Sequence, residues 1–371
     1  MGTGSQGKER PFILVTGTDP ESQAGGIANA LPGYLAALDF AGFEWRFIRT
    51  HHPTDPGSRF GIWFVALFRI TRQLLKLRFR GIKVQHYGHA GEMPALFRQG
   101  VILWLVRLLG GRAAIQLHAL QVSDYLNHPL KRRLFLTFIS GANVVCVLTP
   151  WWQQRLTEAG VKKPLAVIPN PLPASLETIA QQPIPSLPPP KPSENPNPGI
   201  TLLAITRLVP GKGIKEVIKA LTYLPDTFRL IVAGDGENRQ MLETYCHTLN
   251  LDSRVQFTGW VSGKDKEDLF KNSDILCLPS QCDSFGIVFV ESMGYGLPVV
   301  ALDSGPIGDV VPHGRGGLLV KQNDPATLVA AIRSLENPEK RLSLGQSAKR
   351  WVLEQFSARV VGARLEKLFM D

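Results

Sequence analysis

The sequence predicts an α/β protein made of two doubly wound domains, each a parallel sheet with helices on both faces. Short apolar runs of strand length recur along the chain with helical patterns between them, which is typical of repeated βαβ units. The pattern stops at a proline-rich stretch and then restarts, so two sheets are expected. The 371 residues, 44% of them hydrophobic and 19% charged, are enough for two cores and too apolar for intrinsic disorder.

The first domain is expected to span residues 1–168 and to contain six strands. These are the apolar runs 12–16, 45–49, 84–87, 114–118, 144–148 and 166–168. The uncharged run 134–154 is long enough for a bilayer-spanning helix, but Ser140-Gly141-Ala142-Asn143 and Thr149-Pro150 break it into helix, strand and helix. We therefore expect no transmembrane span.

A proline-rich linker is expected over residues 169–199, because 11 of the 28 prolines lie in 169–198 with little periodicity. The second domain then covers residues 200–340, and residues 341–371 are expected to form helices that pack back across the domains. The six strands expected in the second domain are 201–205, 228–233, 255–257, 275–278, 299–302 and 318–320.

Four cysteines without paired C-x-x-C spacing favour a reducing compartment. The start, MGTGSQGKERP, has no apolar core of a signal peptide, and Gln6 stands where a myristoylation signal has Ser or Thr. These features predict a cytoplasmic protein.

The net charge of +10 is confined to the first half of the chain. Residues 1–168 hold 20 Lys and Arg against 9 Asp and Glu, whereas residues 169–371 hold 21 against 22. A localised positive charge predicts an anionic partner for the first half.

A glycine-rich turn with two cations follows the strand 201–205. Backbone amides at the start of the helix that begins at Ile214, together with Arg207 and Lys212, could hold a diphosphate. The alternative is a solvated turn whose cations face water. In the next turn, Asp235-Gly236-Glu237 could suggest a metal site, but turn geometry and capping of the following helix are the stronger interpretation.

The segment 279–298, PSQCDSFGIVFVESMGYGLP, is the most informative in the chain. A strand ends, a polar loop follows and a helix begins near Gly286, so free amides around Ser284 and Phe285 point toward an anion. Asp283 and Glu291 could both face a ligand. Alternatively, Asp283 is an N-cap and Glu291 a solvated helix residue.

Two features of the first half could contact a ligand. Gly25 and Gly26 precede a helix expected from Ile27 and form either a phosphate-contacting loop or an ordinary turn. His118 ends an apolar strand, where α/β sheets present ligand-binding residues, although a packed or capping histidine is the alternative.

Together these segments resemble the retaining, nucleotide-sugar-dependent glycosyltransferases of family 4, which have the GT-B fold of two Rossmann-like domains facing a central cleft. The resemblance is strongest from residue 200 to about 325. It rests on the ordered elements ITRLVPGKGI, VAGDGENRQML, VQFTGWV, LPSQCDSFGIVFVESMGYGLPVVA and GGLLV.

The resemblance implies a role for each matching residue. Arg207 and Lys212 would bind the donor diphosphate, Glu291 the ribose hydroxyls, and His118 the transferred sugar. Gly25 and Gly26 would close over the diphosphate. The implied catalytic residues are His118, Arg207, Lys212, Asp283 and Glu291, and the implied donor-binding residues are Gly25, Gly26, Arg207, Lys212, Ser284, Phe285, Gly286 and Glu291.

One residue departs from the family pattern of two glutamates eight apart, because the first is Asp283, one methylene shorter. No metal or other cofactor is implied, since cations and helix amides would stabilise the leaving nucleotide diphosphate, and the chain has no Asp-x-Asp. The donor, UDP- or GDP-linked, would be a substrate. The resemblance further implies front-face substitution with retention.

Residues 59–83 hold seven cations and no acid, interleaved with aromatic residues. Arg69, Arg72, Lys76 and Arg80 recur at helical spacing, which is typical of an amphipathic helix on an anionic membrane. The alternative is a core-covering helix with a solvated basic face; nothing in the sequence favours nucleic acid. A lipid-linked glycan or glycolipid acceptor, as in cell-surface polysaccharide or lipopolysaccharide synthesis, would explain this charge and place the protein peripherally on the inner face of the cell membrane.

Two other functions remain open from the sequence. A nucleotide-sugar epimerase uses a similar two-domain scaffold, but it would want carboxylates for acid/base elimination, and the first half has few. A non-catalytic nucleotide-sugar-binding protein is the other, which the joint presence of Arg207, Lys212, Glu291 and His118 disfavours.

Overall fold

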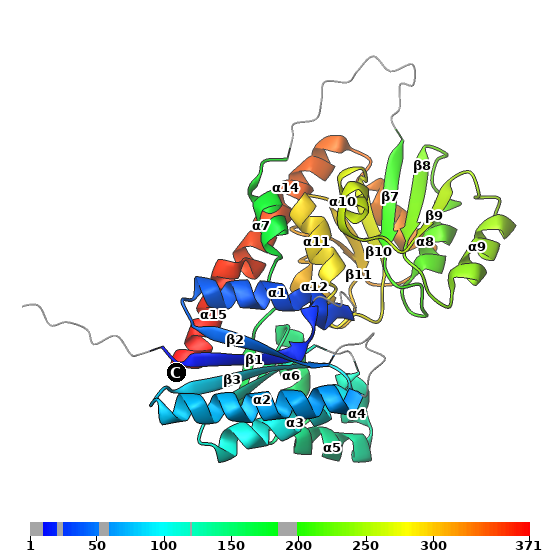
Figure 1. Cartoon of the computed structure of the whole chain (residues 1–371). Coiled ribbons are helices and arrows are strands. Elements are labelled where there is room, and N and C mark those ends of the chain that lie inside the picture. The colour runs from blue at the N-terminus through cyan, green and yellow to red at the C-terminus, as the bar shows by residue number, and fades with distance from the viewer. Residues whose placement is uncertain (1–9, 21–24, 52–58, 119–120, 185–198) are drawn as a thin grey trace, which may run out of the picture. The chain divides into compact units, whose positions relative to one another are not determined.

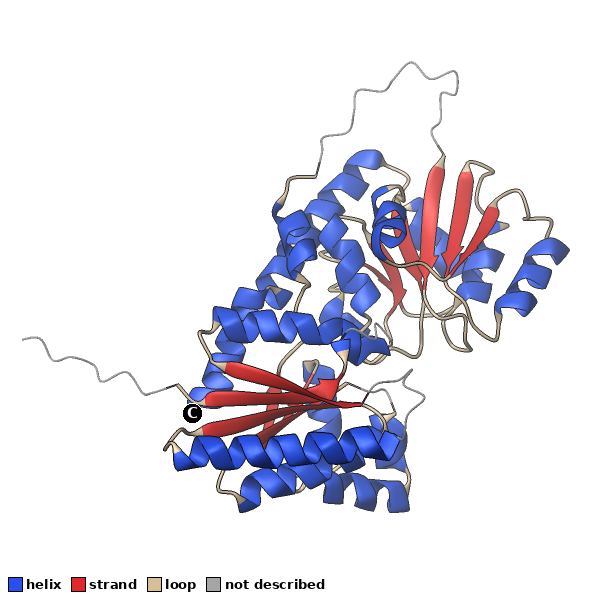
Figure 2. Cartoon of the chain, viewed as in Figure 1, coloured by secondary structure: helices blue, strands red, loops and turns tan. Residues whose placement is uncertain are grey.

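The computed structural model describes residues 10–20, 25–51, 59–118, 121–184 and 199–371 (Figure 1). The chain divides into unit 1, Met1–Ala174 with Phe356–Asp371, and unit 2, Ser175–Gln355. Each unit contains one six-stranded sheet with helices on both faces (Figure 2). All strand pairs within these sheets are parallel, so the predicted pair of doubly wound α/β domains is confirmed.

The sheet of unit 1 has the strand order β2-β1-β3-β4-β5-β6. Each strand overlaps a predicted apolar run. Strands of a parallel sheet are buried on both faces, and they therefore appear in the sequence as continuous apolar runs. His118, predicted as the last residue of a strand, instead lies one residue beyond the end of β4. The strands are β1 (Phe12–Thr18), β2 (Trp45–His51), β3 (Val84–Ala90), β4 (Arg112–Leu117), β5 (Val144–Val147) and β6 (Leu165–Val167).

Helices α2, α3 and α5 cover one face of this sheet, and α1 and α15 cover the other (Figure 1). Helix α1 begins at Gly25 rather than at the predicted Ile27, so Gly25 and Gly26 form its first two residues. The helices of unit 1 are α1 (Gly25–Phe40), α2 (Arg59–Phe79), α3 (Met93–Leu108), α4 (Val122–Asn127), α5 (Pro129–Ile139), α6 (Pro150–Glu158) and α15 (Ala358–Met370).

Helix α15 comes from the far end of the sequence but is part of the core of unit 1. It packs along α1, and Gly362 lies so close that a Cβ there would be 2.7 Å from the Ala37 carbonyl oxygen. Phe369 packs edge-on against Phe43 and Tyr87, with ring centroids 5.8 and 5.5 Å apart. Unit 1 therefore depends on residues that follow all of unit 2 in the sequence.

The sheet of unit 2 has the order β12-β11-β10-β7-β8-β9. Its strands are β7 (Ile200–Ile205), β8 (Phe228–Ala233), β9 (Val255–Gly259), β10 (Ile275–Leu278), β11 (Val299–Leu302) and β12 (Gly317–Val320). The helices are α7 (Ala174–Gln181), α8 (Ile214–Leu221), α9 (Arg239–Thr248), α10 (Gly263–Lys271), α11 (Ile287–Tyr295), α12 (Ile307–Val310), α13 (Pro325–Arg333) and α14 (Pro338–Phe356), the last of which ends in unit 1.

Part of the predicted linker 169–199 is helical. Helix α7 buries Leu176 and Ala180, and Lys349 of α14 donates hydrogen bonds to carbonyl oxygens of Ile179 and Gln182. This helix is short and is flanked by prolines, so its periodicity is too weak to predict it from the sequence. Residues 185–198 of the predicted linker lie outside the described part of the chain. Within the described ranges, no helix is long and apolar enough to cross a bilayer.

Candidate functional site

Two loops of unit 2 lie together beyond the carboxyl ends of neighbouring strands. Residues 206–213 follow β7 and residues 279–286 follow β10, and these strands pair in parallel. The amide of Gln281 donates a 2.8 Å hydrogen bond to the Gly211 carbonyl oxygen, which ties the loops to each other. Open α/β sheets bind ligands at this edge.

Glycines let these loops turn into the helices that follow. Gly213 precedes α8 at φ +76°, and a Cβ there would lie 2.5 Å from the Pro279 carbonyl oxygen. Gly286 precedes α11 at φ +74°, and a Cβ would lie 2.3 Å from the Phe289 ring. Only glycine tolerates this combination of left-handed backbone and close approach. The first amides of α8 and α11 consequently lie at the same sheet edge as the two loops.

Lys212 and Asp283, predicted separately as site residues, form an ion pair. The Lys212 Nζ lies 2.8 Å from Asp283 Oδ1 and also donates to the Cys282 carbonyl oxygen at 3.2 Å. The side chains are only 10% and 18% exposed, and Asp283 Oδ2 is buried with no hydrogen-bond partner among the described residues. Asp283 is not the N-cap considered from the sequence, because Gly286 occupies that position. The pair places a partly shielded cation beside the loop before α11.

Arg207 is exposed on the first loop. The turn after β8 packs against that loop, since Cβ atoms at Gly234 and Gly236 would lie 1.8 and 2.5 Å from carbonyl oxygens of Thr206 and Leu208. Asp235, weighed as a helix cap, instead accepts a hydrogen bond from Arg239 at 3.1 Å, and Asn238 is the N-cap of α9. The described ranges contain no group of three His, Cys, Asp or Glu placed to hold a metal ion.

Glu291 lies one turn into α11 and pairs with a residue that the sequence did not single out. Lys266 Nζ lies 2.7 and 2.8 Å from the two carboxylate oxygens of Glu291, whose side chain is 18% exposed. Glu291 is therefore not the solvated helix residue of the alternative interpretation. Ser284 is half-buried and Phe285 is 1% exposed in the loop before α11.

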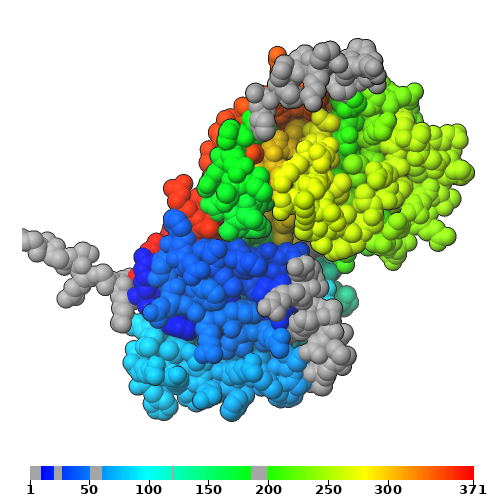
Figure 3. All heavy atoms as spheres, turned by 45° about the horizontal axis from the view of Figure 1, so that its top comes forward, coloured from blue at the N-terminus to red at the C-terminus, as the bar shows by residue number. Residues whose placement is uncertain are grey.

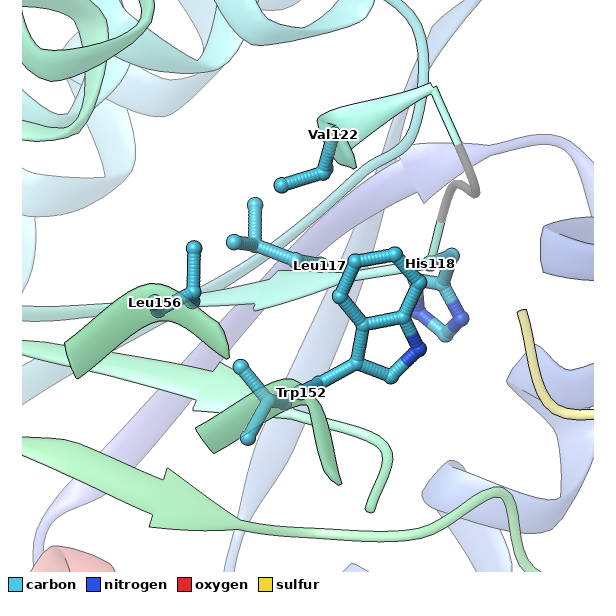
Figure 4. Close-up of a pocket in the computed structure, with 6 residues that line it drawn as sticks. Leu117, His118, Val122, Trp152 and Leu156 are labelled. Atoms are coloured by element: carbon cyan, nitrogen blue, oxygen red, sulfur yellow. The ribbon is translucent and has the colours of Figure 1, made fainter. Parts of the chain in front are cut away.

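His118 belongs to unit 1 and is also paired. Its Nε2 lies 2.9 Å from Nδ1 of His89, and the two rings stack with centroids 5.2 Å apart. His118 lines a small, mostly apolar pocket with Leu117, Val122, Val147, Trp152 and Leu156 (Figure 4). His118 would thus meet any ligand with its Nε2 already hydrogen-bonded. The signal that could have revealed His89 is its position near the end of β3, directly beside β4.

His118 is part of a buried polar cluster in unit 1. Thr16 Oγ1 lies 2.8 Å from His86 Nε2 and donates to Gln99 Oε1 at 2.9 Å. Burial lowers the pKa of His86 and of His118 to about 3. Burial first, and then the neighbouring His118 and His86, lowers the pKa of His89 well below its usual value. All three imidazoles are therefore neutral at pH 7.

Mild acid should consequently destabilise the protein. The unfolded chain takes up protons on His86, His89 and His118 near pH 6.5, and the folded chain does not. The contribution of these neutral histidines to the free energy of unfolding is therefore complete above pH 6.5 and is lost from there toward pH 3. Each histidine contributes a slope of up to about 1.4 kcal/mol per pH unit. Urea unfolding between pH 7.5 and 5.5 measures the slope.

His118→Asn should reduce that slope, whereas His247→Asn, at a side chain that is 81% exposed, serves as the control. The comparison uses slopes, so it survives a general loss of stability in the variant. An unchanged slope in His118→Asn would contradict the prediction.

The four predicted membrane-surface residues are exposed on unit 1. Arg69, Arg72 and Lys76 lie on the outer face of α2, whereas Arg80 lies in the turn just beyond its end, which corrects its placement on the helix. Large apolar side chains share this outer face: Phe64, Phe68 and Phe79 are 59%, 69% and 89% exposed. The opposite face of α2 buries Trp63, Ala66, Ile70, Leu74 and Leu77 in the core.

Comparison with known proteins identifies the second half of the chain. Residues 190–351 match the family of glycosyl transferases group 1. This segment, somewhat less than half of the chain, is similar to group 1 glycosyltransferases. It contains Arg207, Lys212, Asp283 and Glu291, and the predicted family resemblance is thereby confirmed.

Curated relatives match part of the chain. The chain is 31% identical over 159 residues to an uncharacterized glycosyltransferase of Methanocaldococcus jannaschii, which covers 42% of this chain and 41% of the relative. It is 28% identical over 179 residues to a GDP-mannose-dependent alpha-(1-6)-phosphatidylinositol monomannoside mannosyltransferase of Mycolicibacterium smegmatis, covering 45% and 47%. The chain thus spans less than half the length of these relatives.

Solved structures extend the comparison to the whole fold. Anabaena HepE in complex with UDP and glucose superposes with a TM-score of 0.70 at 18% identity, over 97% of this chain and 99% of HepE. The predicted GT-B fold is confirmed. His118, Gly25 and Gly26 belong to unit 1, outside the segment that matches the family, and the other predicted catalytic and donor-binding residues lie within that segment.

Proposed function

We propose that the protein is a retaining glycosyltransferase that moves a sugar from a UDP- or GDP-linked donor to a glycan or glycolipid acceptor. The observation that carries this proposal is the arrangement at one sheet edge of the segment that matches the family. There Lys212, exposed Arg207, the amides that begin α11 and the carboxylate of Glu291 follow neighbouring strands. This combination suits a nucleoside diphosphate, with cations for the phosphates and a carboxylate for ribose hydroxyls.

The chemistry follows from charge. The nucleotide diphosphate gains negative charge as the bond to the sugar breaks, and preorganised cations and helix amides stabilise that charge most strongly in a partly desolvated site. Lys212 is oriented by Asp283, whose second oxygen is buried and has no hydrogen-bond partner in the part of the chain that the structure describes. Phosphate oxygens would share the lysine with Asp283. In this proposal the cations do the work that a divalent ion does elsewhere, and His118 contacts the transferred sugar.

The acceptor proposal rests on the outer face of α2. Exposed cations and exposed phenylalanines on one helix are typical of a protein lying on an anionic lipid surface. A lipid-linked glycan or glycolipid of cell-surface polysaccharide or lipopolysaccharide synthesis would be presented at such a surface, on the inner face of the membrane. The name of the mycobacterial relative likewise specifies a phosphatidylinositol-linked acceptor.

The test of donor use is ligand binding followed by turnover. Thermal unfolding is measured with UDP, GDP, ADP and their sugars in excess EDTA, because a ligand that binds only the native state raises its apparent stability. We expect one nucleotide series to raise the Tm, and the corresponding sugar to be released slowly to water in the same chelator. Retention is read from the anomer formed in transfer to an added acceptor glycan.

Several outcomes would count against the proposal. Binding of no nucleotide would remove the donor assignment. Binding without hydrolysis or transfer would favour a non-catalytic nucleotide-sugar-binding protein, and interconversion of the donor sugar would favour an epimerase. Activity lost in EDTA and restored by magnesium or manganese would show that a metal is needed.

A further inference from the structure

The carboxylate of Glu291 is held on both oxygens by a lysine from the neighbouring helix. Lys266 lies on α10, and α10 packs beside α11, the helix that carries Glu291. The Nζ–O distances of 2.7 and 2.8 Å are those of strong charge-assisted hydrogen bonds. Lys266 is 30% exposed and Glu291 18%, so solvent only partly screens the pair. The yellow segment that includes α10 reaches the surface of unit 2 (Figure 3).

Both ends of this ion pair are themselves fixed by packing. Phe270 lies one turn after Lys266 on α10, with its ring centroid 6.0 Å from the Lys266 Nζ. Its ring stacks on that of Tyr295 at a centroid distance of 5.2 Å and an angle of 12°. Tyr295 in turn lies one turn after Glu291 on α11. The four side chains form two parallel cross-helix contacts, one ionic and one aromatic.

We infer that Lys266 is a positioning residue that fixes the Glu291 carboxylate for recognition of both hydroxyls of a ribose cis-diol. The inference rests on the proposed function, in which Glu291 binds the donor ribose. A carboxylate has about four acceptor sites, and Lys266 occupies one on each oxygen. One site on each oxygen then remains for a hydroxyl donor, and two adjacent hydroxyls match two adjacent oxygens.

This arrangement predicts selectivity for ribose over deoxyribose. A site built to pair two hydroxyls rejects an analogue that lacks one, because a partly buried acceptor is left unpaired. Without Lys266 the carboxylate rotates more freely and can follow a single hydroxyl. Loss of the lysine should therefore weaken nucleotide binding and also reduce discrimination between the two sugars. If the salt bridge only ties α10 to α11, loss of Lys266 should change neither the nucleotide affinity nor the preference for ribose over deoxyribose.

The experiment measures Kd by calorimetry for UDP, 2′-deoxy-UDP, GDP and 2′-deoxy-GDP on the full chain. Wild type should prefer the ribose form of the bound nucleotide by roughly 10-fold or more, the size expected for a hydrogen bond to a charged group. Lys266→Met should bind that nucleotide roughly 10-fold more weakly and discriminate by about 2-fold or less. Lys266→Arg, which can pair with both oxygens, should restore most of the discrimination.

Lys271→Met is the matched control. Lys271 lies on the same helix and pairs with a carboxylate, Glu267, at 3.1 Å, but its side chain is 50% exposed, and its Nζ is 5.9 Å from the Tyr295 ring centroid rather than on Glu291. It should leave both affinity and discrimination unchanged. If thermal unfolding shows that Lys266→Met is not folded, Lys266→Gln is used in its place.

The outcomes separate this inference from the proposed function. If wild type binds neither UDP nor GDP, the proposed function fails and the inference fails with it. If wild type binds one of them and the Lys266 variants keep the wild-type preference for ribose, the inference alone is overturned.

Discussion

Arg207→Ala is expected to reduce kcat/KM for sugar transfer by roughly 30- to 1000-fold while leaving the Tm unchanged. The loss corresponds to about 2 to 4 kcal/mol of transition-state stabilisation, as for removal of one preorganised group from a developing anion. The Tm should not move because Arg207 is exposed and packs in no core. Initial rates with the nucleotide sugar found by thermal shift, together with thermal unfolding, measure both effects.

Lys212→Ala is expected to lose as much activity but also to destabilise the fold. The destabilisation follows because Lys212 neutralises Asp283 at 2.8 Å in a pair that is mostly buried. Removing one partner leaves a buried charge, which costs about 3 kcal/mol. The double variant Lys212→Ala with Asp283→Asn should recover stability without recovering activity. Wild-type turnover in both Arg207→Ala and Lys212→Ala would refute the diphosphate-binding role of these two residues.

The strands could be predicted because their signal is local. The apolar residues of each of the twelve runs by themselves indicate a buried strand. The runs 228–233, 275–278 and 299–302 match the bounds of β8, β10 and β11. Glycine turns with positive φ before α8 and α11 were likewise visible as Gly213 and Gly286. Local chemistry was therefore sufficient for the architecture and for the loops of the site.

The side-chain pairs of the site could not be predicted in the same way. Lys266 sits in the charged run Lys264-Asp265-Lys266-Glu267-Asp268, and nothing local distinguishes it from its neighbours. It meets Glu291, 25 residues away, only because α10 and α11 pack together. The pairing of His89 with His118 similarly depends on the register between β3 and β4. Such pairs are set by tertiary packing, which composition and spacing do not encode.

Reversing Arg69, Arg72, Lys76 and Arg80 to glutamate is expected to weaken binding to anionic vesicles by roughly 1000-fold or more at low salt. Each cation near an anionic surface contributes about 1 kcal/mol, and reversal adds repulsion to the lost attraction. All four side chains are exposed, so the fold should tolerate the change. Sedimentation with phosphatidylglycerol vesicles, and with phosphatidylcholine vesicles for comparison, measures the effect, and added salt should weaken wild-type binding.

A charge-matched control separates a local surface from net charge. Reversing the exposed Arg229, Lys321, Lys340 and Arg350 of unit 2 changes the net charge equally. This control should keep most vesicle binding and nucleotide affinity. Equal loss in both variants, or no sedimentation of wild type with anionic vesicles, would contradict the membrane proposal and favour a soluble acceptor.

The return of α15 to unit 1 has a consequence for synthesis on the ribosome. Helix α1 emerges early, but its partner α15 follows residues 175–355, which form all of unit 2. At about 5 to 20 residues per second, that interval is on the order of 10 to 40 seconds. During this time the surface around Ala37 and Tyr87 that α15 will cover is without Gly362 and Phe369. Unit 2 can fold as a continuous stretch of nascent chain, whereas unit 1 begins first and finishes last, with an apolar surface that is open to chaperones or to other chains until α15 arrives.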